Sequence, residues 1–233
     1  MSEPVPTSAL AIYAHPDDPE VSCGGTLAGW AAAGAEVHVV VCARGDKGSS
    51  DPLADPQALA VRRGEEMASA AAALGVASHL RLAHLDGELE NTIELRGELV
   101  EIVRRLRPQV VICPDPTAVL FGSRYFNHRD HRMVGWATLD AVAPAASSPH
   151  YFADRGVAHQ VESVYLSGTL EPDLWIDITG SVDAKAAALM CHRSQMGETG
   201  EWLRQVVRQR AEEGGRTAGV EFAEGFRLLR LVG

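Results

Sequence analysis

The sequence predicts an α/β protein: a three-layer Rossmann-like domain in which helices cover both faces of a mostly parallel sheet. Apolar, β-branched runs alternate with helix-like segments throughout the first half of the 233 residues. Their order, strand–helix–strand–helix–strand–helix–strand, suits a parallel sheet with right-handed crossovers. The composition, 46% hydrophobic and 22% charged, is typical of a globular chain with a sizeable core. We therefore expect residues 1–233 to form one domain without a linker or an internal repeat.

The first elements follow from apolar runs and the turn residues that end them. Ala9 to Ala14 (ALAIYA) is a short apolar run that predicts a buried strand. The segment from Thr26 to Ala33 is helix-like and ends at Gly34, a residue type common just after a helix. Glu36 to Ala43 (EVHVVVCA) predicts a second strand. Residues 44–56 are too rich in Gly, Asp, Ser and Pro for either element.

The later elements continue the alternation. Residues 58–74 have helical composition and end at Gly75, and residues 79–83 predict a third strand. Between Glu94 and Leu106 the apolar residues recur at the 3.6-residue spacing of an amphipathic helix. A proline then stops this helix before a fourth strand over residues 109–113. Further helices are expected over residues 133–142 and from Val182 onward.

Charge and cysteine content exclude several classes of protein. Asp and Glu number 31 against 21 Lys and Arg, a formal net charge of −10, so we expect no nucleic-acid partner. The four cysteines lie far apart without a C-x-x-C pair, which indicates free thiols in a reducing compartment. The first residues lack the pattern of a secretory signal, and no apolar run approaches the roughly 18 residues of a membrane span. The sequence therefore predicts a cytoplasmic protein and leaves open whether it forms a homo-oligomer.

Three carboxylates and an imidazole follow the first predicted strand. His15, Asp17, Asp18 and Glu20 lie in the segment HPDDPE. Like charges this close raise one another's pKa and destabilise the fold unless a cation neutralises them. Because imidazole nitrogen and carboxylate oxygen suit zinc or ferrous iron, the segment predicts a metal site. The alternative, acidic capping of the helix expected from Thr26, accounts for one acid but not for two adjacent acids with a histidine.

His128, Asp130 and His131 form a second cluster in the segment NHRDHR, after the fourth predicted strand. Taken alone, the segment is equally compatible with a solvated helix start in which Asp130 faces the helix dipole. The carboxyl ends of parallel strands meet at one edge of a sheet, so we expect the two clusters to lie together. His15, Asp18 and His131 then make a three-ligand site with an open position for water, the arrangement of a catalytic metal.

The motifs AHPDDPE (residues 14–20) and NHRDHR (residues 127–132) resemble those of the LmbE/PIG-L family of metal-dependent de-N-acetylases. Weaker matches, among them segments around Arg63, Lys185 and Glu224, extend the resemblance over nearly the whole chain. The resemblance implies a metal-dependent amide hydrolase that removes an N-acyl group, usually N-acetyl, from a glucosamine-type sugar. The expected partner is a small N-acylated sugar or sugar conjugate.

The resemblance also implies that His15, Asp18 and His131 hold Zn²⁺, with Fe²⁺ or another divalent metal as the alternative. Zinc lowers the pKa of bound water from about 15.7 to about 7, so that hydroxide can attack the amide carbonyl. Asp17, which would not bind the metal, would be the general base that accepts the remaining proton and later delivers it to the leaving amine.

The other roles follow from the same resemblance. His128 would polarise the carbonyl and stabilise the oxyanion, with Asp130 orienting or charging it. Arg63 matches the arginine that contacts the sugar in this family. Asp86, which precedes a glycine, is either a turn former or an acceptor for a sugar hydroxyl.

One departure from the family concerns a tyrosine. In mycothiol-pathway deacetylases a mobile tyrosine stands two residues before the first histidine of the second motif. That position here is Phe126, with Tyr125 beside it. This departure argues against mycothiol chemistry, and a mycothiol-type thiol-sugar conjugate amidase stays the alternative to the main interpretation. The segment from His192 to Gln195 is assigned to a substrate contact or an interface.

Three alternatives come from other classes of protein. The two-histidine, one-carboxylate set also suits a non-haem iron oxygenase, but such an enzyme does not need the additional base Asp17. A non-catalytic metal-binding module is a second alternative, which acetate release from an N-acetyl sugar would exclude. A dinucleotide-binding domain shares the fold class, but Gly24-Gly25 is not a G-x-G-x-x-G motif and the neighbouring acids would repel a pyrophosphate.

Overall fold

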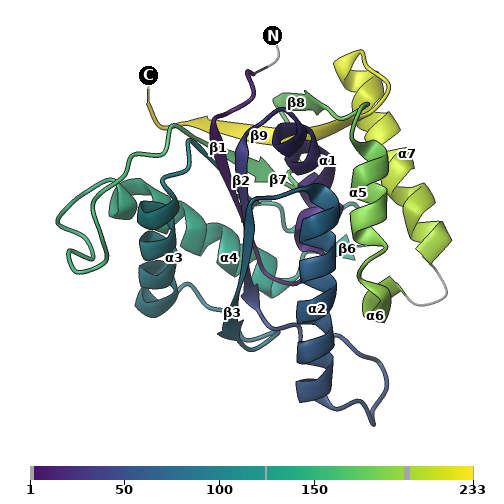
Figure 1. Ribbon diagram of the computed structural model, residues 1–233, viewed down its shortest axis with the longest axis horizontal. Coiled ribbons are helices and arrows are strands. Elements are labelled where there is room, and N and C mark those ends of the chain that lie inside the picture. The colour runs from purple at the N-terminus through teal and green to yellow at the C-terminus, as the bar shows by residue number, and fades with distance from the viewer. Residues whose placement is uncertain (1–2, 124, 197–199, 233) are drawn as a thin grey trace.

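A seven-stranded sheet in the order β3-β2-β1-β4-β7-β9-β8 forms the centre of the molecule (Figure 1). The computed structural model describes residues 3–123, 125–196 and 200–232, with the backbone alone for residues 200–203. The strands from β3 to β7 in this order pair in parallel, whereas β9 is antiparallel to both of its neighbours. The strand bounds are β1 Ser8–Tyr13, β2 Glu36–Ala43, β3 Ser78–His84, β4 Val110–Pro114, β7 Ser163–Ser167, β8 Leu174–Asp177 and β9 Ala223–Arg230. A separate hairpin pairs β5 Leu120–Phe121 with β6 Tyr125–Phe126.

Helices cover both faces of the sheet, which confirms the predicted α/β class. Helices α1, α2, α5 and α7 lie on one face, and α3 and α4 lie on the other (Figure 1). Side chains of β1 alternate between two apolar cores: Leu10 and Ile12 pack with α3 and α4, and Ala11 and Tyr13 pack with α1, α2 and α5. The helix bounds are α1 Asp18–Ala32, α2 Pro56–Leu74, α3 Ile93–Leu106, α4 Arg129–Asp140, the π-helical η1 Ala141–Ala146, α5 Val182–Leu189, α6 Arg193–Met196 and α7 Gly200–Ala218.

Helix α1 begins eight residues earlier than the sequence suggested. It starts at Asp18, and the prediction that it starts near Thr26 is wrong. Pro19 suits the first turn because its missing amide hydrogen would be unpaired there, and the acids Asp18 and Glu20 face the positive end of the helix dipole. The acidic motif therefore forms the first turn of a helix instead of a loop.

Helix α4 also begins earlier, at Arg129 instead of Met133. Its N-cap residue is His128, whose ring Nδ1 accepts a hydrogen bond from the backbone amide of Asp130 at 3.2 Å. Such a side-chain cap satisfies one of the free amides of a helix start. Consequently His131 lies in the first turn of α4, as Asp18 does in α1.

Helix α1 is interrupted at Cys23, whose φ and ψ of −141° and 18° are not helical. The amides of Gly25 and Thr26, just after the break, donate to the two carboxylate oxygens of Glu224 at 3.0 and 2.7 Å. Glu224 belongs to β9 and is 6% exposed. A carboxylate from the last strand thus caps the second part of α1.

Lys185 completes this arrangement. Its ammonium lies 2.5 Å from Glu224 Oε1 and donates to the carbonyl of Val21 at 2.9 Å. Both side chains of the ion pair are 5% exposed, so each charge depends on the other for compensation. The pair joins the two parts of α1 to α5 and β9, directly behind the acidic first turn.

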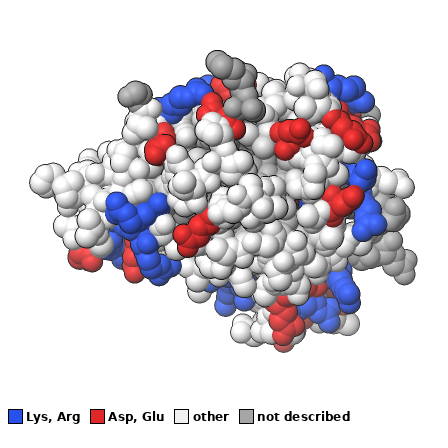
Figure 2. Space-filling model, turned by 45° about the horizontal axis from the view of Figure 1, so that its top comes forward, with Lys and Arg blue, Asp and Glu red and all other residues white. Residues whose placement is uncertain are grey.

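Charged side chains are interspersed on the face drawn in Figure 2. There Lys and Arg groups alternate with Asp and Glu groups around a broad uncharged centre and form no continuous basic surface among the described residues. In the part of the chain that the structure describes, no helix is both long enough and apolar enough to cross a bilayer.

Candidate active site

The order of the strands reverses between β1 and β4, which are neighbours although β2 and β3 separate them in the sequence. In open α/β sheets, ligands bind outside the carboxyl ends of the strands at such a point. The segment after β1 carries the first motif, and the segment after β4 carries the second. The two motifs therefore meet there, as the sequence predicted.

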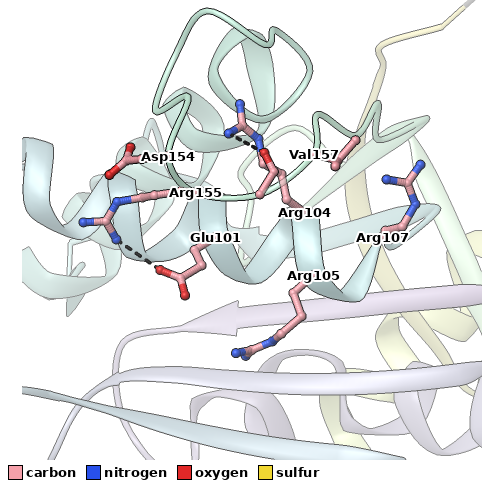
Figure 3. Close-up of a pocket in the computed structure, with 8 residues that line it drawn as sticks. Glu101, Arg104, Arg105, Arg107, Asp154, Arg155 and Val157 are labelled. Atoms are coloured by element: carbon pink, nitrogen blue, oxygen red, sulfur yellow. Dashed lines mark hydrogen bonds and ion pairs between the residues drawn. The ribbon is translucent and has the colours of Figure 1, made fainter.

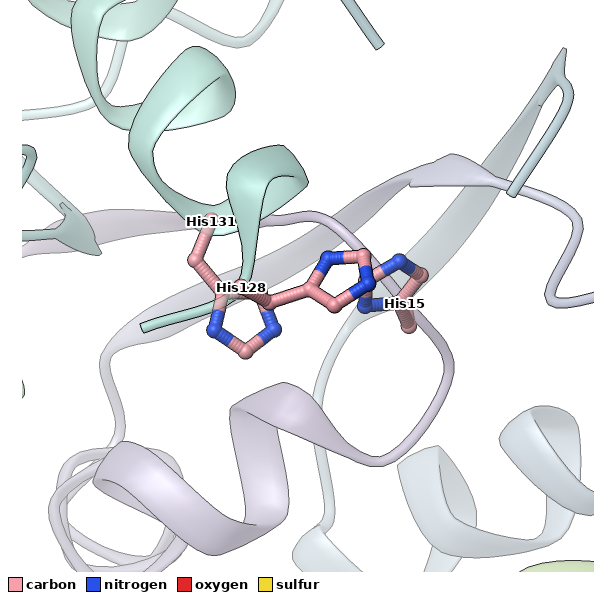
Figure 4. Close-up of side chains that lie close together, drawn as sticks. All are labelled: His15, His128 and His131. Carbon is pink, nitrogen blue, oxygen red and sulfur yellow. The ribbon is translucent and has the colours of Figure 1, made fainter. Parts of the chain in front are cut away.

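Three imidazole rings lie together at this point (Figure 4). His15 follows β1, whereas His128 and His131 come from the start of α4. One ring nitrogen from each histidine lies within 4.8 Å of the others. The ring centroid of His15 is 4.9 Å from that of His128 and 5.3 Å from that of His131.

Asp18 lies between two of these rings. One of its carboxylate oxygens is 3.3 Å from His15 Nδ1, and the other is 3.1 Å from His131 Nε2. The backbone amide of His15 also donates to this carboxylate, at 2.7 Å. Two imidazole nitrogens and a carboxylate are the ligand types that zinc takes in catalytic sites. The donor atoms of His15, Asp18 and His131 therefore fit a divalent metal.

The far side of the His15 ring faces two carboxylates. Its Nε2 lies 3.1 Å from Asp130 and 3.2 Å from Asp86. Because ionised carboxylates only accept hydrogen bonds, Nε2 carries a hydrogen and Nδ1 is the nitrogen available to a metal. Such outer partners fix the tautomer and the orientation of metal-binding histidines.

His131 is fixed by a residue that sequence reasoning missed, Asn127. His131 Nδ1 lies 3.1 Å from Asn127 Oδ1, which accepts its hydrogen. The amide nitrogen of the same side chain donates to the carbonyl of Ala118 at 2.8 Å, which settles the orientation of the amide group. The backbone amide of Asn127 donates to the carbonyl of Val119, also at 2.8 Å. Only its place as the first residue of the second motif could have drawn attention to it.

The buried charges shift the pKa values of this cluster. Burial lowers the pKa of His15, but the charge of Asp18 and the hydrogen bonds to Asp130 and Asp86 outweigh it and raise the pKa to about 12. Burial raises the pKa of Asp18, yet the charges of His131 and His15 hold it well below its usual range. The charges that hold a proton on His15 would also attract a divalent cation, whose binding releases that proton.

Asp17 stands beside the donor set and not in it. Its φ of 105° lies in the left-handed region that non-glycine residues rarely adopt. Arg63 Nη2 donates to Asp17 Oδ1 at 3.1 Å and to the carbonyl of Pro16 at 2.5 Å. Burial and the charge of Asp18 raise the pKa of Asp17 to about 7, against the opposing charge of Arg63. Asp17 is thus a carboxyl group with a pKa suited to proton transfer near neutral pH.

Arg63 is enclosed by the loop after β2. Its side chain is 3% exposed and its Nη1 donates to the carbonyl of Gly45 at 3.2 Å. A Cβ atom at Gly45 or at Gly48 would lie 2.5 Å from this nitrogen, so only glycine leaves room for the guanidinium. The resemblance implied a sugar contact for Arg63, and its contacts in the structure are with Asp17, with Asp86 at 3.9 Å and with the backbone.

Asp130 also differs from its expected contact. Its carboxylate is fully buried and accepts hydrogen bonds from the amides of Gly87 and Leu89 at 2.7 and 3.3 Å, in addition to its contact with His15. The hydrogen bond between the two residues comes from the backbone amide of Asp130, and the charge of the Asp130 carboxylate opposes the lowering of the pKa of His128 by burial. Because the Nδ1 of His128 accepts that hydrogen bond, its Nε2 is the nitrogen that can donate to a ligand.

The remaining predicted residues lie behind the donor set. Asp86 is 8% exposed and contacts His15. Its backbone amide donates a hydrogen bond to the carboxylate of Asp46 at 3.1 Å, which fixes the backbone of Asp86. The buried His192 contacts Glu20 at 3.1 Å, and the amide of Ser194 donates to the carboxylate of Glu66 at 2.7 Å. The segment after α5 is therefore joined to α1 through Glu20 and to α2 through Glu66.

A cleft of about 860 Å³ opens beside the donor set. Its floor includes Tyr13, whose hydroxyl lies 2.7 Å from that of Ser167. The cleft reaches from the two motifs to the hairpin β5–β6 and to α7. The residues that line it are Tyr13, Asp17, Asp18, Val21, Ser22, Pro114, Phe121, Tyr125, Asn127, His131, Ser167, Gly168, Thr169, Arg210 and Glu213.

A second hollow, of about 910 Å³, lies at the end of α3, by the amino edge of the parallel strands. Figure 3 shows that its guanidinium groups do not converge on one point. Arg104 is turned into the neighbouring loop, where it donates to several backbone carbonyls, and Arg155 pairs with Glu101 at 3.3 Å. None of the motif residues lines this hollow, so the smaller cleft is the candidate active site.

Comparisons with known proteins identify the family of this chain. A family model described as PIG-L, GlcNAc-PI de-N-acetylase, matches residues 10–142, more than half of the chain. The diacetylchitobiose deacetylase of Thermococcus kodakarensis is 32% identical over 225 residues, which cover 94% of this chain and 82% of that protein. The 1D-myo-inositol 2-acetamido-2-deoxy-alpha-D-glucopyranoside deacetylase of Kineococcus radiotolerans is 32% identical over 256 residues, 82% of this chain and 69% of that protein.

The fold is also found among solved structures. The N,N′-diacetylchitobiose deacetylase from Pyrococcus horikoshii, in complex with its inhibitor MPG, has a TM-score of 0.88 at 30% identity. The match covers 97% of this chain and 84% of that one. Together with the family match, this similarity confirms the resemblance that the two sequence motifs indicated.

Proposed function

The chain belongs to the GlcNAc-PI de-N-acetylase (PIG-L) family and is an amide hydrolase, and on this premise we propose that it removes an N-acetyl group from an amino-sugar substrate with the help of Zn²⁺. The observation that carries the proposal is the position of Asp18 between His15 Nδ1 and His131 Nε2, with the carboxyl group of Asp17 free of that donor set. The oxygenase and the binding-module alternatives are not retained, because the relatives described above with 30% identity or more are deacetylases.

His15, Asp18 and His131 would hold the metal ion. When bound, a divalent metal in such a site polarises a carbonyl oxygen and lowers the pKa of water. Asp130 and Asp86 keep the hydrogen of His15 on Nε2, and Asn127 keeps that of His131 on Nδ1, so the opposite nitrogens point toward Asp18.

Asp17 is the proposed general base. With a pKa near 7 it can accept a proton from the attacking water and return it to the nitrogen of the leaving amine. Arg63 holds this carboxylate through Oδ1, which leaves Oδ2 for the proton. The buried guanidinium is thus a positioning group for Asp17, and the sugar contact that the resemblance implies for Arg63 stays a prediction.

His128 is the proposed donor to the oxyanion that forms at the amide carbonyl. Its Nδ1 is occupied by the backbone amide of Asp130, so the hydrogen on Nε2 is directed away from the helix start. Removing one such donor costs typically about 3–4 kcal/mol of transition-state stabilisation. The role assigned to His128 therefore rests on its own cap, and the charge of the Asp130 carboxylate also acts on its ring.

Exchange of Asp17 for asparagine tests the proposal. Metal-replete wild-type protein should release acetate from N-acetylglucosamine or from N,N′-diacetylchitobiose. Asp17→Asn should lower kcat by about 10²–10⁴-fold, the range for loss of a general base, while the bound metal measured by atomic spectroscopy stays unchanged. Asp18→Asn is the matched variant, because it should lose both metal and activity.

Two results would contradict these roles. Retained activity in Asp17→Asn would exclude Asp17 as the base. Loss of metal from Asp17→Asn together with activity would instead make Asp17 a ligand.

A further inference from the structure

Two arginines lie close together outside the cleft, where β2 and the edge strand β3 end. Arg44 follows β2 directly, and Arg81 belongs to β3. In the pairing of these strands Arg81 is opposite Val41, whose side chain packs in the core on the side of α1 and α2. Opposite residues of neighbouring strands share a face of the sheet, so the side chain of Arg81 points toward α2.

The guanidinium of Arg81 is held by backbone carbonyls. Its Nη1 donates to the carbonyl of Arg44 at 3.3 Å and to the carbonyl of Ala60 in α2. A Cβ atom at Gly64, one turn further along α2, would lie 3.0 Å from Cζ and Nη2 of Arg81, so the glycine lets the guanidinium lie against the helix. Within the described part of the chain, Arg81 forms no ion pair with a carboxylate. Its position is thus fixed while its charge has no acidic partner.

The guanidinium of Arg44 is also incompletely satisfied. Its Nη2 lies 3.4 Å from a carboxylate oxygen of Asp46, but its Nε is buried and has no hydrogen-bond partner among the described residues. Buried donors without a partner are rare in native proteins, and each one indicates a bound water or ion. The side chain of Arg44 is 30% exposed as a whole, so a small ligand can reach it from solvent.

Positive charge is in excess at this place. Arg63 is paired with Asp17 and Arg44 with Asp46, which leaves the charge of Arg81 over. Burial lowers the pKa of Arg81, and the charges of Arg44 and Arg63 lower it further, against the opposing charge of Asp46. A protein with a formal net charge of −10 therefore has a locally cationic site between α2 and β3.

We propose that Arg44 and Arg81 bind a small tetrahedral oxyanion, sulfate or phosphate, on the outer side of the loop after β2. Planar guanidinium groups offer paired N–H donors that match the oxygens of such an ion. The ion would compensate the charge of Arg81 and give the donors of Arg44 an acceptor. Neither arginine lines the cleft, so the site is separate from the candidate active site and does not depend on the proposed function.

The location gives the bound ion a structural role. Arg44 begins the loop whose Gly45 carbonyl accepts a hydrogen bond from Arg63 at 3.2 Å. The same loop carries Asp46, which accepts a hydrogen bond from the amide of Asp86 at 3.1 Å. An oxyanion on Arg44 and Arg81 would therefore join this loop to α2 and β3 from the outside.

Equilibrium dialysis with radioactive sulfate tests the inference on the metal-replete protein, with ionic strength kept constant by sodium chloride. We expect one ion per chain with a Kd of about 1 mM or lower. Arg81→Gln and Arg44→Gln should each raise this Kd at least about tenfold, the effect of losing a charge-assisted hydrogen bond. Arg62→Gln, at an exposed arginine of α2, is the matched control and should keep the wild-type Kd.

Two further measurements separate this site from other modes of binding. His131→Ala lacks a metal-ligand residue and should still bind sulfate, because the site does not involve the metal. Competition with inorganic phosphate and with glucose 6-phosphate then distinguishes the sources of the oxyanion. Equal displacement by both identifies the free ion as sufficient, and stronger displacement by the ester identifies a phosphorylated small molecule.

Three outcomes would overturn the inference. They are absence of saturable sulfate binding to the wild type, a wild-type Kd in the folded Arg44→Gln variant, and loss of binding in His131→Ala. Circular dichroism establishes which variants are folded, and Arg44→Gln decides the question if Arg81→Gln is not. Since none of these measurements reads acetate release, failure of the anion site leaves the proposed hydrolase function unaffected.

Discussion

At the scale of single residues, the two histidines of the donor set differ in the groups that accept a hydrogen bond from their rings. His15 faces the buried carboxylates of Asp130 and Asp86, whereas His131 faces the neutral amide of Asn127. A carboxylate makes an imidazole a stronger ligand, and an amide mainly fixes its orientation. Asn127 is itself held by two backbone carbonyls in the segment before β5, so the geometry of His131 depends on that segment.

Replacement of Asn127 should weaken metal binding. In Asn127→Ala, Nδ1 of His131 loses its acceptor, and we expect the affinity for Zn²⁺ to fall about 10–100-fold. Competition with a chromogenic chelator measures this affinity without reference to activity. Asn127→Asp keeps an acceptor and should lose less. Asn91→Ala, at an asparagine paired with Asp140, is the control, and an unchanged affinity in Asn127→Ala would exclude the role.

Replacement of Arg63 should affect the reaction more than metal binding. In Arg63→Lys the charge remains, but an ammonium lacks the planar fork that joins Asp17, Pro16 and Gly45. Misplacement of a catalytic group by about 1 Å can cost roughly 100-fold, so we expect kcat to fall about 10–100-fold. The metal content should stay at the wild-type level. Arg62→Lys, at the exposed neighbour, is the control, and a wild-type kcat in Arg63→Lys would contradict the positioning role.

Residue types and spacing in the sequence were enough to predict the chemistry of the site. They were not enough to predict which residues contact one another there. His15, Asp18 and His131 could be named because metal-ligand residue types are clustered in two short motifs. The contacts of Arg63 and Asp130 could not be predicted, because they depend on how close the loops after β2 and β3 approach the two motifs. Asn127 was missed because an amide carries no charge pattern that marks it.

At the scale of elements, the break in α1 is the feature with the most consequence for the site. The part of α1 before the break carries Asp18 and Glu20, and the part after it packs in the core. The ion pair of Lys185 and Glu224 satisfies the backbone groups that the break exposes. The first turn can therefore be oriented toward the cleft independently of the rest of the helix.

Disruption of this ion pair should destabilise the protein. Lys185→Met leaves the carboxylate of Glu224 buried without compensation, and we expect the free energy of unfolding to fall by about 3–5 kcal/mol. The double variant Lys185→Met/Glu224→Gln removes both charges and should be more stable than the single variant. Urea denaturation measures both, with Lys47→Met at an exposed lysine as the control. A double variant less stable than Lys185→Met would contradict the charge argument.

The elements of the first half were predicted well where periodicity and turn residues agree. Strand β2 has the predicted bounds, and α3 begins one residue early because Thr92 caps it through its side chain. The starts of α1 and α4 were missed because charged first turns look like loops in a sequence. The hairpin β5–β6 and the strands β7 to β9 were not assigned, since they are short or only half-buried and their pairing is long-range.

At the scale of the whole molecule, metal binding should contribute to the stability of the fold. The cluster around His15 brings Asp18, Asp86 and Asp130 together in a buried place, and a cation that binds only the folded state stabilises it. At a free Zn²⁺ concentration of about 100 times Kd, we expect Tm to rise by roughly 5–10 °C over the chelator-treated protein.

Differential scanning fluorimetry checks this expectation. His131→Ala is the control variant, because loss of a ligand should abolish the shift in Tm. A Tm that does not respond to chelation and metal return in the wild type would contradict a structural contribution of the metal.

The order of assembly follows from the contacts of Glu224. The amides that it caps in α1 belong to residues 199 and 198 positions earlier in the chain. Pairing over such separations forms late, because the intervening chain must be brought into place first. During synthesis, the segment with the metal-ligand residues leaves the ribosome long before the strand that fixes its helix. The amino-terminal part alone should therefore be a poor catalyst, and activity should appear only once β9 has entered the sheet.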